Sequence, residues 1–128
     1  FPYTTLFRSM SWDVITQTGL NVRRGWERLA VKYSLKINHW GLPALAGFSF
    51  ISDNAQAYKT LITQEMLKKG YLAGNSVYSC VDHTPDILEI FFENLEPIFS
   101  QIKDCEDGED VMGLLEGPIC HSGFKRLN

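Results

Sequence analysis

The chain has 128 residues, of which 45% are hydrophobic and 12% aromatic, so it can build one packed domain and does not read as disordered. Its 12 lysines and arginines face 15 acids, for a formal charge of −3, and it has no basic block that would suit nucleic acid. No apolar run approaches the roughly 18 residues that a membrane span needs. Cys80, Cys105 and Cys120 are odd in number and irregularly spaced, which argues against a disulfide framework and fits a reducing cytoplasm.

The first nine residues, FPYTTLFRS, differ in character from the rest. They resemble the translation of a sequencing adapter read into a gene fragment, so we interpret residues 1–9 as a non-native leader and 10–128 as the domain. An ordinary strand fragment is the alternative. From Ser11 a long helix is predicted, in which Gly19 and Gly25 require either close packing against a neighbour or a break. Its apolar side chains recur at helical spacing: Ile15, Val22, Trp26, Leu29 and Tyr33.

Residues 35–40 and 46–51 are predicted to form two strands joined by a turn at 41–44. Side chains alternate between the two faces of a strand, so Phe48 and Phe50 share one face. We expect that face to meet the helices.

A second helix is predicted after Asp53 or Asn54, either of which can cap its first turn. Gly70 then ends the helix, because glycine adopts the left-handed conformation that other residues resist. One face of this helix is apolar: Tyr58, Leu61, Ile62 and Met66.

Two further short strands are predicted at 71–73 and 77–81, around a polar loop at 74–76. Short connections favour antiparallel pairing of the last strand with the earlier two. Thr84 and Pro85 then begin a helix, as a capping hydroxyl followed by proline in the first turn. Its apolar face contains Leu88, Phe91, Phe92, Leu95, Phe99 and Ile102.

Residues 106–110 are predicted as a solvated acidic turn, followed by a short helix at 111–115. The predicted fold is therefore α+β, with a small three-stranded antiparallel sheet and helices packed mainly on one face.

Several segments, in order, carry a resemblance to a known family: GWERLA, KINHWGLPALAGFSF, YKT, TQEMLKKGYLAGNSVY, the following His83-Thr84, and LLEGPICHSGFKRLN. Together they resemble the C-terminal domain of class III pyridoxal-phosphate aminotransferases, in the branch called glutamate-1-semialdehyde aminomutase-like. The resemblance runs from about Trp12 to Asn128. It implies the small C-terminal domain of a fold-type-I enzyme.

In that family pyridoxal phosphate and its Schiff-base lysine belong to a large domain that precedes the small one. The resemblance thus implies a piece of a homodimeric, cytoplasmic enzyme that moves an amino group between a small amino donor and a keto or aldehyde acceptor. By itself the chain is expected to be inactive. Two alternatives stay open: a glutamate-1-semialdehyde 2,1-aminomutase, which is an isomerase, and a non-enzymatic interaction module.

Asn75 and Ser76 are the candidate substrate-binding residues, since the equivalent segment of the family approaches the substrate. In the aminomutase an acidic residue lies before the equivalent strand, and here Asn75 takes its place. An amide cannot pair with an ammonium group as a carboxylate does, which counts against aminomutase activity. The structural alternative is a plain turn, with asparagine chosen because it tolerates positive φ.

The other reactive side chains favour structural roles. Lys59 lies off the apolar face of its helix and is expected to be solvated rather than catalytic. His83 is expected to be buried or half-buried and bonded to backbone. The pairs Cys80 with His83 and Cys120 with His121 lack the spacing of a four-ligand zinc site, so no metal is expected.

The tryptophans are predicted to be core or interface anchors: Trp12, Trp26 and Trp40. Near the end of the sequence, Lys125 and Arg126 could bind an acid group, and a surface salt bridge is the alternative.

Overall fold

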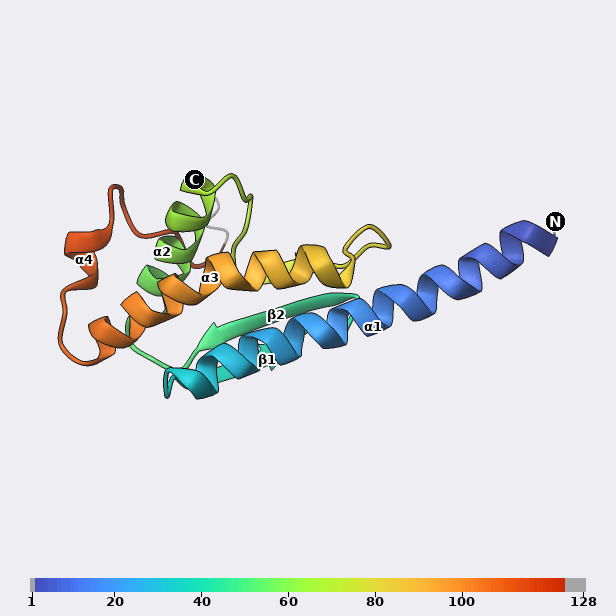
Figure 1. The fold of residues 1–128 in the computed structure, drawn as a ribbon. Helices are drawn as coiled ribbons and strands as arrows, with labels where there is room; N and C mark the ends of the chain where they lie inside the picture. Colours follow the sequence, from blue (N-terminus) through green and yellow to red (C-terminus); the bar gives the residue numbers. More distant parts are fainter. Residues whose placement is uncertain (1, 124–128) are drawn as a thin grey trace.

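Three short antiparallel strands form one sheet in the order β1-β2-β3, with β2 in the centre (Figure 1). The computed structural model describes residues 2–123, with side chains from Ser11 onward. In chain order the elements are α1 (Pro2–Lys32), β1 (Ile37–Trp40), β2 (Leu45–Phe50), α2 (Ala55–Lys68), β3 (Ser76–Tyr78), α3 (Pro85–Glu106) and α4 (Val111–Leu114). The α+β fold with a three-stranded antiparallel sheet is as predicted.

Helix α1 begins at Pro2 rather than after Ser11, and its first half projects beyond the sheet (Figure 1). The non-native origin of residues 1–9 stays a prediction. The helix runs unbroken through both internal glycines. Each glycine lets another part of the chain pack closely against the helix. A methyl group on Gly19 would overlap the carbonyl of Pro43, and one on Gly25 would overlap the ring of Phe92. Close packing, and not a break, accounts for both.

The strands pair much as expected. Ile37 lies opposite Phe50, and Leu45 lies opposite Tyr78. The turn between β1 and β2 contains Gly41 at φ +81, a conformation that suits glycine. The prediction of a strand at 71–73 is wrong, because this segment is irregular. The strand predicted at 77–81 is present as β3, which occupies only three residues.

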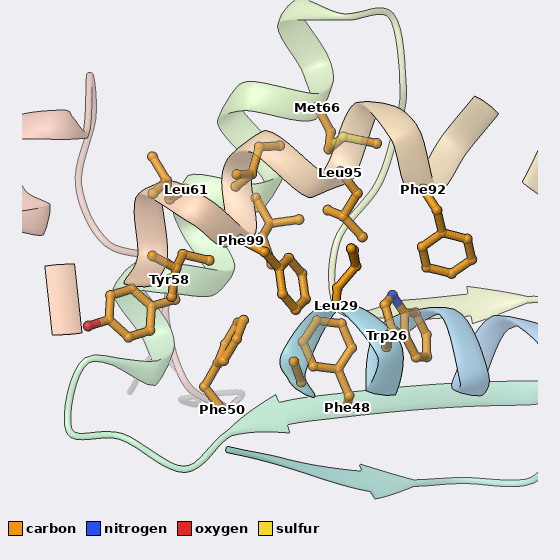
Figure 2. Close-up of a cluster of buried hydrophobic side chains, with 14 of the residues drawn as sticks. Trp26, Leu29, Phe48, Phe50, Tyr58, Leu61, Met66, Phe92, Leu95 and Phe99 are labelled. Atoms are coloured by element: carbon orange, nitrogen blue, oxygen red, sulfur yellow. The ribbon is translucent and has the colours of Figure 1, made fainter. Parts of the chain in front are cut away.

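The core lies between the sheet and the three longer helices (Figure 2). Phe48 and Phe50 point from one face of β2 into this core, as predicted, and the Phe48 ring lies 4.7 Å from that of Trp26. The other aromatic members are Tyr58, Phe92 and Phe99. Helices α1, α2 and α3 thus cover the face of the sheet that carries Phe48. Successive residues of a strand point to opposite faces of the sheet. The face away from the core therefore carries Leu45 of β2, its partner Tyr78 of β3, and Trp40 of β1, which pairs with Gly47.

The end of α2 and the start of α3 lie where the sequence predicted them. Gly70 ends α2 at φ +88. The hydroxyl of Thr84 accepts a hydrogen bond from the Ile87 amide at the start of α3. Asn54 occupies the N-cap of α2 without a side-chain capping bond. Trp12, in contrast, is 67% exposed and anchors no core within the described chain.

None of the helices within residues 2–123 combines the length and the apolar character needed to cross a bilayer.

Candidate functional site

Asn75 is tied to the central strand by two hydrogen bonds. Its side-chain Nδ2 donates to the carbonyl oxygen of Phe48 at 2.8 Å, and the Phe48 amide donates to the Asn75 carbonyl at 2.9 Å. Positive φ is not the reason for an asparagine here, since the described non-glycine residue with positive φ is Ser34. The side chain therefore holds the start of β3 against β2. Its Oδ1 atom has no protein partner within the described residues.

Ser76 lies in β3 opposite Gly47 and borders an open crevice of about 310 Å³. The crevice runs between β3, the irregular segment 71–73 and the first turns of α3. Its walls are mostly apolar, with Ser76, His83 and two tyrosines as polar members. The full lining is Val22, Tyr71, Leu72, Ala73, Ser76, Val77, Tyr78, His83, Ile87, Leu88 and Phe91. Of the two predicted substrate-binding residues, the structure brings Ser76 to this crevice, and Asn75 lies beside it in the chain.

His83 is half-buried and bonded to backbone, as predicted. Its Nδ1 accepts a hydrogen bond from the Cys80 amide at 3.2 Å. In the neutral ring the proton therefore sits on Nε2, which leaves this lining residue one N–H donor. A ring held in this way can donate one hydrogen bond to a neighbouring carbonyl or carboxylate.

An acid that accepts two hydroxyl hydrogen bonds lies away from this crevice. Glu106 accepts hydrogen bonds from the hydroxyls of Ser52, at 2.6 Å, and Tyr58, at 2.5 Å. These bonds lower the pKa of the Glu106 carboxyl. Burial, followed by the bond to Glu106, raises the pKa of Tyr58.

Sequence reasoning missed this cluster, because it placed Glu106 in a solvated turn. The available signal was the phenol of Tyr58 on a buried helix face, since a buried hydroxyl needs a partner.

A second carboxylate, Glu96, joins α3 to the end of α1. It accepts a hydrogen bond from the Tyr33 hydroxyl at 3.0 Å and pairs with Lys32. The hydrogen bond from Lys32 is the largest cause that lowers the pKa of Glu96. Both acids connect elements of the fold and face no common cavity with His83.

The remaining candidates do not form a reactive site. Lys59 is half-buried on α2. All three cysteines are free, and within the described residues no group of three or more histidine, cysteine or acidic side chains could hold a metal. Lys125 and Arg126 lie outside the described residues.

Pyridoxal phosphate requires a lysine for the Schiff base, an acid beside the pyridine nitrogen and a cup for the phosphate. The residues that the structure describes do not fit that set. The crevice contains no lysine and no carboxylate. Lys103 borders a separate cavity, where it is ion-paired with Asp107 at 2.9 Å. No step of cofactor chemistry is therefore assigned to the described side chains.

No protein-family model matches the sequence, and no curated protein matches it. One solved structure is similar: the internal aldimine form, with pyridoxal phosphate, of the FumI protein from Sphingopyxis sp. MTA144. The TM-score is 0.64 at 16% identity, over 82% of this chain and 26% of that one. The fold of this chain therefore resembles part of that neighbour. The likeness at this identity is one of fold, and the chain matches about a quarter of the length of its neighbour.

Proposed function

We propose that this chain is the small domain of a class III pyridoxal-phosphate aminotransferase. The enzyme transfers an amino group between a small amino donor and a keto or aldehyde acceptor. A larger domain holds the cofactor and the Schiff-base lysine. The small domain walls one side of the substrate site and positions the substrate, a contribution that can reach several kcal/mol.

The fold match carries this proposal. Most of the chain superimposes on a protein that holds pyridoxal phosphate, yet it accounts for only a quarter of that protein. The described residues do not bring a lysine, an acid and a phosphate cup together at one site, which agrees with a domain that borders a cofactor site without containing it. The order of the family-like segments in the sequence supports class III.

Asn75 favours transamination over the aminomutase reaction. Its free Oδ1 can accept one hydrogen bond from an amino group, but the amide carries no negative charge to pair with an ammonium ion. Its Nδ2 is also held by the Phe48 carbonyl, which fixes the orientation of the amide. A glutamate-1-semialdehyde aminomutase is the second candidate, supported by the same resemblance and opposed by this residue.

The test uses the complete open reading frame that contains this chain, expressed with pyridoxal phosphate. We expect a visible absorption band from the protonated internal aldimine. An amino donor should bleach this band, and a keto or aldehyde acceptor should restore it. The 128-residue chain alone should give no such band, because none of its described lysines lies in a suitable site. An aldimine on the chain alone would overturn the proposal.

Two controls separate the alternatives. Conversion of glutamate-1-semialdehyde without an external amino acceptor would identify the aminomutase. A complete reading frame that encodes no Schiff-base lysine, and forms no aldimine, would identify an interaction module.

A further inference from the structure

One edge of the sheet has unpaired backbone groups beside an apolar crevice. The Phe48 amide donates to the Asn75 carbonyl, and the Ser79 amide donates to the Ala44 carbonyl at 2.9 Å. Because residues of an antiparallel strand alternate between its two edges, Val77 also faces β2. The amide and carbonyl groups of Ser76 and Tyr78 therefore point to the outer edge of β3.

That outer edge has no partner in the described chain. No backbone hydrogen bond reaches Ser76 or Tyr78 from the segment 71–73, although this segment lies across the crevice. Open edges present donors and acceptors at strand spacing, and natural proteins usually cover or shorten them. The group that matches such an edge is another extended polypeptide.

The side chains around the edge are apolar and exposed. Leu72 is 97% exposed and Tyr78 is 76% exposed, and Ile87 at the start of α3 is 47% exposed. Exposed apolar residues that cluster beside an open strand mark an interaction surface. Every second side chain of an added strand would enter the crevice between β3 and α3. Because the crevice walls are mostly apolar, those side chains should be apolar.

Charge narrows the choice of occupant. The crevice lining contains no aspartate, glutamate, lysine or arginine, and His83 is its one imidazole. Asp82 and Asp86, both exposed, are adjacent in sequence to the lining residues His83 and Ile87. An occupant that is uncharged where it faces the crevice, with a basic residue toward the start of α3, complements this surface.

We propose that an extended segment of the cofactor-holding part of the enzyme adds to the free edge of β3 as a fourth strand, with alternate apolar side chains in the crevice. The inference rests on the proposed function, in which three quarters of a protein like the structural neighbour lies outside the matched part. A second copy of this chain is less favoured, since edge-to-edge pairing would join two strands of only three residues each.

Amide hydrogen exchange on the complete protein tests the pairing. The opposite edge of the sheet supplies matched control amides. The Ile51 amide donates to the Lys36 carbonyl, so by the same alternation Ile37 and His39 point away from β2. We expect Ser76 and Tyr78 to exchange at least about fivefold more slowly than these two, the factor for a net hydrogen bond of about 1 kcal/mol. Equal rates at the two edges would overturn the inference.

A proline variant gives a second measurement. Tyr78→Pro removes an outward amide that β2 does not use, and His39→Pro does the same at the other edge. In the complete protein, Tyr78→Pro should speed exchange at Ser76 and lower the unfolding temperature more than His39→Pro does. Equal effects of the two variants would contradict strand addition.

The exchange and aldimine measurements together distinguish failure of the fourth strand from failure of the proposed function. Formation of the aldimine together with unprotected Ser76 and Tyr78 amides would overturn only the fourth strand. Protection without an aldimine would support pairing by the remainder of the protein and overturn the aminotransferase. Protection in the 128-residue chain that disappears on dilution would identify a second copy as the occupant, against the inference.

Discussion

At the residue scale, the bonds that fix this fold join residues far apart in sequence. Tyr58 and Glu106 lie 48 positions apart, and their hydrogen bond ties α2 to the end of α3. The helical spacing of Tyr58 predicted its burial correctly. It could not indicate which acid the phenol would reach, because that depends on how α2 and α3 pack.

Tyr58→Phe tests this bond. Removing the hydroxyl should cost about 1 kcal/mol at neutral pH, below the roughly 1.5–3 kcal/mol of a bond to a charged group, because Glu106 is exposed to solvent. The pKa of Glu106 is lower in the folded protein than its ordinary value of 4.5. Its stabilisation is therefore present above that value and is lost as the pH falls through the folded pKa.

The measurement is urea unfolding of both proteins at neutral pH and at successively lower pH. The difference between wild type and Tyr58→Phe should shrink as Glu106 becomes protonated. Tyr71→Phe is the control, since the Tyr71 hydroxyl accepts only a long bond of 3.5 Å from Asn94 and meets no carboxylate. A Tyr58→Phe deficit that stays constant with pH would contradict a bond to ionised Glu106.

The sequence predicted only part of the candidate site. The pattern around residue 75 indicated a ligand-facing loop, yet Ser76 belongs to a strand and the Asn75 amide binds Phe48. The half-buried state of His83 followed from its place before the Thr84 cap. Its hydrogen bond to the Cys80 amide depends on the path of residues 79–84, which no periodicity encodes.

At the element scale, the sequence predicts what periodicity and capping control. The face of α2, the start of α3 at Thr84 and the first two strands all agree with their patterns. The segment 71–73 has the composition of a strand but no partner beside it. A strand depends on its neighbour as well as on its own residues, and here that neighbour is absent from the described chain.

The two glycines of α1 give a prediction at this scale. Alanine is the better helix former by about 1 kcal/mol, so Gly19→Ala would stabilise an isolated helix. In the fold, the added methyl group would overlap the Pro43 carbonyl, which belongs to the backbone of the β1–β2 turn and cannot rotate away. Overpacking of this kind costs about 1–3 kcal/mol, so we expect net destabilisation.

Gly113→Ala is the matched control, because it also lies in a helix and its new methyl group would meet only ordinary contacts. Urea unfolding should show a lower midpoint for Gly19→Ala and an equal or higher one for Gly113→Ala. A stabilised Gly19→Ala protein would show that α1 does not approach the turn so closely.

At the scale of the whole molecule, helices cover one face of the sheet, and no element of residues 2–123 covers the other. Helices bury Phe48 and Phe50 on one side, while Trp40 and Tyr78 stay 44% and 76% exposed on the other. The sequence predicted helices on one side of the sheet. It could not show how much apolar surface the other side would leave in contact with water.

This uncovered face should make the 128-residue chain associate with itself. Tyr78 is the most exposed aromatic side chain on the face, and threonine keeps the strand while removing the ring. We expect Tyr78→Thr to lower the apparent mass seen by light scattering at high protein concentration. Val31→Thr is the matched control, because Val31 is 74% exposed but lies on α1, outside the sheet. If both variants reduce association equally, general surface hydrophobicity is responsible, and a wild-type chain that stays monomeric at every concentration would remove the role of this face in self-association.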